Sequence, residues 1–295
     1  MGILQIEDII EHMNSAINWK KRIVLIAKLI LHFRTKELMR RSRVYILKRL
    51  IRELWLVNVD PLQIMKDLII EDNFESTPQR IRSGLFEGLI LETDSWSRGD
   101  LVSIISGNYE REVLEWIYQT GPFETIINVG AGTGYYPLGL IHVNLAKNAV
   151  LFEVNSDSIE IARENAERNG LQNFCTFYGK ASESNLLATE LEKNSLVIID
   201  IEGGEFELLT DRVLNKFASS SLCVEIHDFT DAQKNDFFEL LERSARTHSI
   251  EILNQSERNP HIFPEILQLD ENSRWLLMSE GRPGPMSWLC LSPLI

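Results

Sequence analysis

The chain has 295 residues, enough for one large domain or for one domain with a smaller appendage, and its 44% hydrophobic and 25% charged residues are typical of a globular protein. No uncharged apolar run approaches the roughly 18–20 residues of a membrane span, and the acidic start lacks the basic region of a secretory signal. Three cysteines, far apart and odd in number, argue against a disulfide framework or a zinc cluster and predict a reducing, cytoplasmic location.

The net charge of −13 is unevenly distributed. Residues Lys20–Arg52 contain 12 Lys or Arg and one acid, Glu37, a local balance of +11 that leaves −24 for the rest of the chain. Such a segment could bind an anionic membrane surface, nucleic acid or an acidic partner. Its few aromatic residues disfavour stacking on single-stranded nucleic acid, so no nucleic acid is expected. We favour a helical cap on the acidic domain of the same chain or of a homodimer mate, with peripheral membrane contact as the alternative.

Apolar residues at helical spacing predict helices over residues 1 to about 70, one of them starting at Pro61. The less regular stretch Glu71–Gly88 predicts a linker. We therefore divide the chain into a basic, helical N-terminal region, residues 1–80, and a second domain, residues 81–295.

Beyond residue 84 the signals for strands and helices follow one another along the chain. Strands are expected at Leu85–Leu91, Ile126–Val129, Ala149–Phe152, Phe174–Tyr178, Leu196–Ile199, Leu222–Ile226, Ser249–Leu253 and Trp288–Leu291. Helices are expected at Tyr109–Tyr118, Tyr136–Asn144, Asp157–Asn169, Phe206–Phe217 and Ala232–Arg246. This alternation predicts an α/β fold with a Rossmann-like, doubly wound and mostly parallel sheet.

The most informative stretch is the glycine-rich turn after the strand Ile126–Val129. Gly130, Gly132 and Gly134 occupy alternate positions, and glycine is the residue that reaches positive φ without steric cost. Bare backbone lets a ligand approach closely, and a helix that follows presents its free N–H groups. The turn therefore predicts a cofactor site.

Two cofactors compete for this site. A dinucleotide fold requires G-x-G-x-x-G and an acid about 20 residues further on, but Tyr135 stands where the third glycine should be. The spacing G-x-G-x-G resembles instead the first motif of class I S-adenosylmethionine (SAM) methyltransferases. Glu153, which ends the next strand, could accept hydrogen bonds from both ribose hydroxyls of either cofactor.

A second motif makes the resemblance more specific. The run from Asp200 to Leu209, DIEGGEFELL, is similar to the D-[VIL]-E-G-x-E-x-x-[LV]-L signature of FkbM-like methyltransferases, and Val224–His227 is similar to their V-E-I-H strand ending. Ser83–Gly88 and Gly107–Glu110 resemble elements that precede the fold in that family. The family usually has an acid two residues before the first glycine, where this chain has Asn128, so its contact with the cationic end of SAM would be weaker.

The resemblance implies a class I methyltransferase fold with SAM as the cofactor. It also implies methyl transfer to a hydroxyl of a sugar, a glycan or a secondary metabolite. The cofactor-binding residues that it implies are Gly130, Ala131, Gly132, Gly134, Tyr135, Glu153, Val154 and Asp200. The chain lacks N-P-P-[YF] or D-P-P-Y after the fourth strand, which argues against an enzyme that methylates flipped-out bases.

Methyl transfer to a hydroxyl requires a base, because the oxygen loses its proton as the new bond forms. The candidates follow the strands at their carboxyl ends, where open α/β sheets bind ligands. We predict His227 as the base, with Glu225 or Glu202 orienting it or the acceptor hydroxyl. The alternation of side chains along a strand places Glu225 and His227 on the same side.

A divalent cation is the alternative use of these side chains. Asp200, Glu202, Glu225 and His227 offer the oxygen-rich ligands, with one imidazole, that suit Mg²⁺ or Mn²⁺. A metal is possible but not expected, because nothing in the sequence sets the distances between these residues. The remaining histidines show no ligand spacing.

Near the C-terminus, Glu280–Trp288 is a turn-rich loop in which Arg282 could clamp an anionic substrate group. Trp288 could stack on a sugar face or belong to the core, and Trp275 is expected in the core.

A SAM-dependent O-methyltransferase is thus the first hypothesis. The second, from a different class, is a non-catalytic module of this fold that binds a partner through its basic helices. A dinucleotide oxidoreductase is a distant third.

Overall fold

The computed structural model describes residues 61–74, 78–93, 97–190, 194–282 and 284–294. The chain divides into two compact units, Met1–Asp72 and Asn73–Ile295. The expected helices before residue 60 and the basic segment Lys20–Arg52 lie outside the described residues. Helix α4 (Pro61–Asn73) begins at the expected proline. None of the helices in the described part of the chain has the length and apolarity to cross a bilayer.

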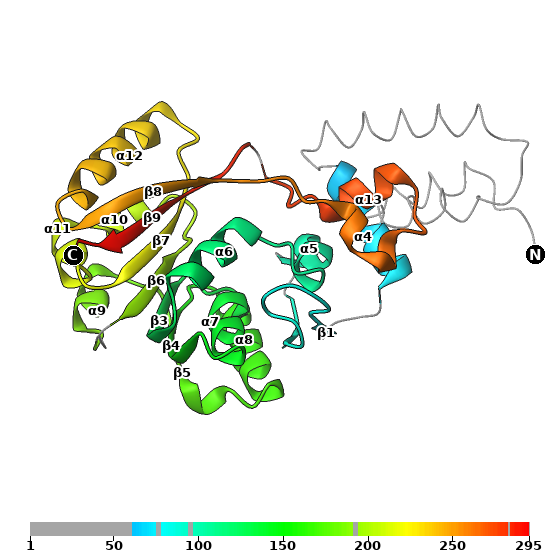
Figure 1. Ribbon diagram of the computed structural model, residues 1–295, viewed down its shortest axis with the longest axis horizontal. Helices are drawn as coiled ribbons and strands as arrows, with labels where there is room; N and C mark the ends of the chain where they lie inside the picture. The colour runs from blue at the N-terminus through cyan, green and yellow to red at the C-terminus, as the bar shows by residue number, and fades with distance from the viewer. Residues whose placement is uncertain (1–60, 75–77, 94–96, 191–193, 283, 295) are drawn as a thin grey trace, which may run out of the picture. The chain divides into compact units, whose positions relative to one another are not determined.

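A seven-stranded sheet forms the centre of the second unit (Figure 1). Its strands are β3 (Phe123–Val129), β4 (Ala146–Phe152), β5 (Cys175–Tyr178), β6 (Ser195–Ile199), β7 (Ser221–Ile226), β8 (His248–Asn254) and β9 (Ser287–Pro293). They lie in the order β5-β4-β3-β6-β7-β9-β8. Neighbouring strands from β5 to β7 pair in parallel, and β9 runs antiparallel to both β7 and β8.

Helices cover both faces of the sheet, which explains why every residue of β6 and β7 is buried. One face packs against α6 (Arg111–Thr120), α7 (Tyr135–His142) and α8 (Ser156–Arg168). The other face packs against α9 (Glu183–Ala188), α10 (Glu205–Leu208), α11 (Asp211–Lys216) and α12 (Asp231–Ser244). Successive residues of β3, such as Ile126 and Ile127, enter the two opposite cores. The expected Rossmann-like, doubly wound sheet is confirmed.

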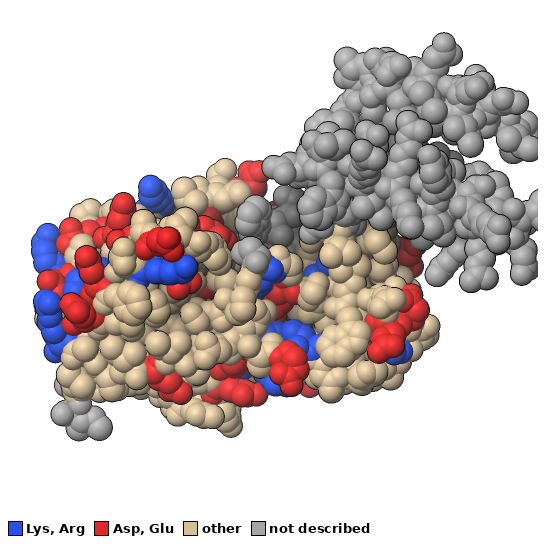
Figure 2. Space-filling view, turned by 90° about the horizontal axis from the view of Figure 1, so that it is seen from above, with Lys and Arg blue, Asp and Glu red and all other residues tan. Residues whose placement is uncertain are grey.

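Shorter elements complete the unit. They are β1 (Gln79–Arg80), β2 (Ile90–Leu91), η3 (Ser97–Asp100), α5 (Leu101–Ile105), η4 (Gln172–Phe174), η5 (Pro260–Ile262), η6 (Pro264–Ile266) and α13 (Glu271–Met278). Figure 2 shows acidic and basic side chains interspersed on one face of the described residues, with uncharged stretches between them. That face carries no continuous patch of a single sign.

The structure corrects three expectations from the sequence. The helix expected over Phe206–Phe217 is broken into α10 and α11, because Thr210 is extended and its hydroxyl accepts the N–H of Val213 as the cap of a new helix. Of the β structure expected over Leu85–Leu91, only Ile90–Leu91 is a strand; glycines at positive φ turn the chain before it. Trp275 is not a core residue, because 45% of it is exposed on the outer side of α13.

Candidate functional site

The glycine turn after β3 is shaped by close backbone packing. Gly130 has φ +80°, and a Cβ atom there would lie 1.7 Å from the carbonyl oxygen of Asp200, at the end of the neighbouring strand β6. Gly134 has φ +92° and caps the N-terminus of α7. Gly132 also has positive φ, +51°, but a Cβ there would meet nothing within 4 Å. Packing thus requires glycine at position 130, whereas position 132 faces open space that a ligand can occupy.

Glu153 connects this turn to the end of β4. Its Oε2 accepts the N–H of Gly132 and its Oε1 accepts the N–H of Asn155, both at 2.8 Å. Each carboxylate oxygen keeps a second lone pair, so Glu153 can still accept hydrogen bonds from a ligand's hydroxyls. The next residue, Val154, is 74% exposed beside it.

The other residues expected at the cofactor lie deeper. Ala131 and Tyr135 are buried, and the Tyr135 ring packs edge-on against Phe86 and Tyr109. A cofactor contact at these two positions would therefore come from the backbone. Asn128 is buried too, and its amide donates to the carbonyl of Ile198 on β6 at 3.4 Å.

His227, directly after β7, is held by a residue that the sequence analysis missed. Glu205 is fully buried at the start of α10, and its Oε1 accepts the backbone N–H of His227 at 3.0 Å and lies 3.2 Å from Nδ1. Its Oε2 accepts the N–H of Gly203 at 2.9 Å. Since a carboxylate only accepts, Nδ1 carries the proton and the lone pair of the neutral ring is on Nε2.

Three carboxylates surround Nε2 of His227. Glu202 Oε2 lies at 3.5 Å, and Asp200 Oδ1 and Glu225 Oε2 each lie at 3.8 Å. Glu202 itself is 69% exposed and has φ +53°, in the left-handed region that disfavours a side chain. The structure therefore brings together His227, Glu225 and Glu202, as the sequence predicts, but gives the orienting contact to Glu205.

Arg282 neutralises part of this acidic cluster from the C-terminal loop. Its guanidinium pairs with Glu110 and Glu225, and its Nε lies 3.1 Å from Glu280. The same group lies 5.4 Å from the ring centre of Trp288, which is buried in the core. Arg282 is therefore already engaged by three carboxylates and is not the clamp for an anionic substrate that the sequence suggests.

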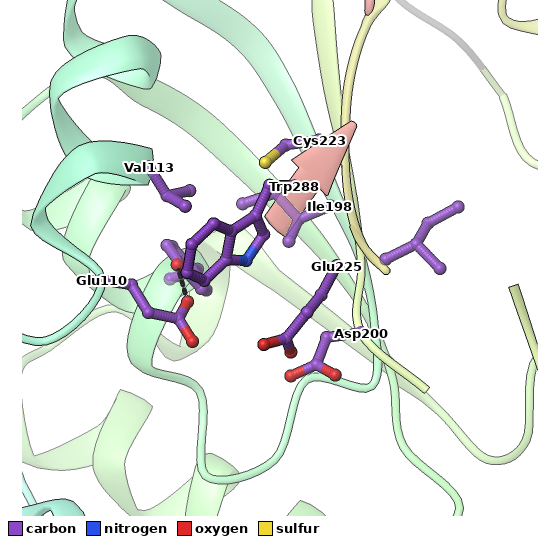
Figure 3. A pocket seen from close by; sticks show the side chains of 9 residues that line it. Glu110, Val113, Ile198, Asp200, Cys223, Glu225 and Trp288 are labelled. Carbon is purple, nitrogen blue, oxygen red and sulfur yellow. Dashed lines mark hydrogen bonds between the residues drawn. The ribbon is translucent and has the colours of Figure 1, made fainter. Parts of the chain in front are cut away.

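A small pocket opens between these groups. Figure 3 shows the carboxylates of Glu110, Asp200 and Glu225 converging beside Trp288. Tyr136, from the first turn of α7, donates its hydroxyl to Glu110. Asp200, which lines the pocket, stands beside the start of the glycine turn, because its N–H donates to the carbonyl of Val129 at 2.9 Å.

Burial and mutual repulsion change the acid–base properties of these carboxyl groups. Burial raises the pKa of Glu110 and of Asp200 to about 7, and burial together with the nearby charge of Asp200 raises the pKa of Glu225 to about 9. Burial alone would lower the pKa of His227, but its hydrogen bond to Glu205 and the surrounding negative charges outweigh it and raise that pKa. Perturbed groups gathered in one pocket are typical of functional sites.

Two site residues that the sequence analysis did not name as candidates lie within motifs that it did identify. Glu205 is the last acid of the DIEGGE run, and Glu110 ends the G-x-Y-E element. Their roles depend on contacts with residues 22 and 172 positions away, His227 and Arg282, which no local pattern specifies.

Comparisons with known proteins find only distant structural similarities among the matches described below. The sequence matches no protein-family model and no curated protein. Among solved structures, an O-methyltransferase from Bacillus cereus in complex with SAH is 13% identical, and the match covers 83% of this chain and 96% of that one with a TM-score of 0.42. A precorrin-6y C5,15-methyltransferase from Geobacter metallireducens is 12% identical, with 69% and 94% covered and a TM-score of 0.45.

An rRNA methylase from Streptococcus thermophilus is 11% identical, with 62% of this chain and 96% of that chain covered and a TM-score of 0.42. At TM-scores below 0.5 these similarities carry no argument about this chain, so a function must follow from the site residues.

Proposed function

We propose that this protein is a SAM-dependent methyltransferase that acts on a hydroxyl group. The observation that carries the proposal is the open space at Gly132. It lies in a turn hydrogen-bonded to Glu153, at the same edge of the sheet as the His227 cluster. One edge thus offers a place for a cofactor and, beside it, groups that can handle a proton.

The cofactor half of the site would consist of the turn Gly130–Gly134 and the end of β4. The backbone at Gly132 lets the methionine part of SAM pass without a clash, and the remaining lone pairs of Glu153 suit the ribose hydroxyls. The side chain of Asn128 is uncharged and donates to the carbonyl of Ile198, so it adds no attraction for the sulfonium cation of SAM.

The acceptor half would be the cluster around Nε2 of His227. SAM, when bound at the glycine turn, would supply an electrophilic methyl group to the acceptor oxygen. The oxygen must lose its proton as the new C–O bond forms. Without a metal ion, Nε2 of His227 takes that proton, and Glu205 holds the ring and stabilises the imidazolium.

We propose a sugar, a glycan or a secondary metabolite as the acceptor, on the resemblance of the DIEGGE run to FkbM-like methyltransferases. The carboxyl groups of Asp200, Glu202 and Glu225 around Nε2 of His227 agree with a polyhydroxylated acceptor, because their oxygens can accept hydrogen bonds from hydroxyl groups. They disfavour an anionic acceptor, since Arg282 is already paired.

Calorimetric titration of the full chain with SAM, and with its demethylated product, tests the cofactor assignment. We expect binding with one site per chain, and we expect Gly132→Arg to abolish it by filling the open space. The matched control is Gly170→Arg. Gly170 also has positive φ and open surroundings but follows α8, so this variant should bind SAM as the wild type does. The absence of heat for both ligands with the folded wild-type chain would refute the proposal.

A further inference from the structure

Three side chains at the carboxyl ends of β6 and β7 have the arrangement of a metal site. Asp200, Glu202 and His227 each offer one ligand atom, and these three atoms lie within 4.8 Å of one another. Nε2 of His227 is 3.8 Å from Oδ1 of Asp200 and 3.5 Å from Oε2 of Glu202. Two carboxylate oxygens and one imidazole nitrogen therefore face a common point.

Two of these ligand atoms, Oδ1 of Asp200 and Nε2 of His227, make no hydrogen bond to a described residue, and the first of them is shielded from solvent. Oδ1 of Asp200 is shielded from solvent and has no hydrogen-bond partner. The His227 side chain is only 5% exposed, and its hydrogen bonds to described residues are made through Nδ1 and the backbone N–H, both to Glu205. A shielded polar atom normally has a partner, so the unpaired Oδ1 of Asp200 facing Nε2 of His227 indicates a ligand between them.

The surroundings of His227 also suit a metal ligand. Histidines that bind metals almost always donate their other ring N–H to a carboxylate or carbonyl, which fixes the tautomer and the direction of the lone pair. Glu205 does this here at 3.2 Å, from a fully buried position. The lone pair on Nε2 consequently points toward Asp200 and Glu202.

We propose that Asp200, Glu202 and His227 hold a divalent cation of the Mg²⁺ or Mn²⁺ class. Such ions take oxygen ligands, and Mn²⁺ also accepts imidazole. With metal–ligand bonds of about 2.1 Å, two ligand atoms at right angles lie about 3.0 Å apart. The distances from Nε2 of His227 to Asp200 and to Glu202, 3.8 and 3.5 Å, would therefore each shorten by less than about 1 Å. Glu202 is exposed and can move that far.

The cation would have a definite place in methyl transfer, and this part of the inference depends on the proposed function. Three protein ligands leave coordination positions open on the exposed side of Glu202, where an acceptor's oxygen can bind. The positive charge then stabilises the oxygen as it loses its proton. His227 becomes a ligand instead of the base, while the methyl group still comes from SAM.

The first test is a calorimetric titration of the full chain, freed of metals with a chelator and without SAM, with MnCl₂. We expect one Mn²⁺ per chain. Glu202→Gln and Asp200→Asn should each weaken the binding at least tenfold, because each removes one charged ligand. The control is Glu207→Gln, an exposed acid two residues beyond Glu205 that should bind Mn²⁺ like the wild type.

The second test identifies the nitrogen ligand. Pulsed electron paramagnetic resonance of bound Mn²⁺ should show coupling to a directly bonded ¹⁴N in the wild type and in Glu202→Gln, but not in His227→Gln. Absence of a stoichiometric Mn²⁺ site in the folded wild type, or equal weakening by Glu202→Gln and Glu207→Gln, would overturn the inference. Because SAM binding is measured separately with chelator present, either proposal can fail while the other stands.

Discussion

Glu205 and His227 are joined twice, since one carboxylate oxygen accepts the backbone N–H of His227 at 3.0 Å and lies 3.2 Å from its ring Nδ1. The first contact fixes the chain just after β7, and the second fixes the ring. The other oxygen of Glu205 accepts the N–H of Gly203 and so orders the turn that carries Glu202. One buried carboxylate thereby positions both sides of the candidate site.

Glu205→Gln should therefore cost stability and change the His227 tautomer. Glutamine has one acceptor oxygen, so either orientation of its amide sets an NH₂ group against an N–H donor. We expect the free energy of unfolding to fall by about 1–3 kcal/mol, measured by urea denaturation. Nitrogen NMR of the His227 ring should show protonation at Nδ1 in the wild type and a mixture of tautomers in the variant.

The exposed neighbour Glu207 supplies the control. Glu207→Gln should change stability by no more than about 0.5 kcal/mol. Equal stability of Glu205→Gln and Glu207→Gln would show that the two hydrogen bonds to His227 contribute nothing.

The glycines of the turn should differ in their tolerance of alanine. Gly130→Ala places Cβ 1.7 Å from the carbonyl oxygen of Asp200, so β3 and β6 cannot keep their spacing and the variant should fail to fold or lose more than about 3 kcal/mol. Gly132→Ala meets no atom within 4 Å and should cost only the left-handed backbone penalty of about 1–2 kcal/mol. Thermal unfolding measures both.

The same pair of variants separates folding from cofactor binding. Folded Gly132→Ala should bind SAM at least tenfold more weakly than wild type, because its methyl group enters the open space. Gly170 also has a positive φ but lies outside the turn. Gly170→Ala should therefore show the same cost in stability without the loss of SAM affinity. Wild-type SAM affinity in Gly132→Ala would place the cofactor elsewhere.

Ionisation of Glu110 should lower the free energy of unfolding as the pH rises. Its pKa is about 7 in the folded protein against an ordinary 4.5, so the folded state binds the proton more tightly. The corresponding stability is complete below about pH 4.5 and is lost as the pH rises through 7. It amounts to about 3–4 kcal/mol at most, from about 1.4 kcal/mol for each pKa unit.

Glu110→Gln removes this titration, so its free energy of unfolding, measured in urea with chelator present, should decline less between pH 5 and 8 than that of the wild type. Glu115→Gln, at an exposed acid on α6, the helix that Glu110 precedes, should keep the wild-type slope. Parallel curves for the wild type and Glu110→Gln would contradict the raised pKa.

Protonation of His248 should lower the free energy of unfolding as the pH falls. Its buried ring lies 3.2 Å from the carbonyl oxygens of Phe217 and Ser220 through Nε2, and 2.8 Å from the Thr247 hydroxyl through Nδ1. The neutral ring with its proton on Nε2 satisfies all three, and burial lowers the pKa of His248. The unfolded chain then binds the proton more tightly, so this contribution to stability is present above about pH 6.5 and is lost below it.

His248→Gln keeps a donor for the carbonyls but cannot titrate. We expect its stability to decline less than that of the wild type between pH 7 and 5, as followed by urea denaturation. His142→Gln, at a ring without burial in the core, serves as the control and should retain the wild-type decline. An unchanged decline in His248→Gln would show that this ring carries no pH-dependent stability.

Much of the fold could be predicted because its signals are local. Apolar runs the length of a strand, most of them followed by a helical pattern, place β3 to β7 within a few residues of their observed ends. The break between α10 and α11 was not predicted, because Thr210, which caps the second helix, resembles in sequence any polar residue within one longer helix. Trp275 escaped because a large apolar residue is only a statistical sign of burial.

The candidate site was also predictable only in part. The residues that follow the strands at their carboxyl ends, among them Gly130, Asp200 and His227, can be identified from the local pattern, and parallel strands bring those ends to one edge. Their interaction partners cannot be identified in this way. Glu205 holds His227, and Arg282 reaches Glu110 across 172 positions, through contacts that depend on chain packing rather than on any neighbouring pattern.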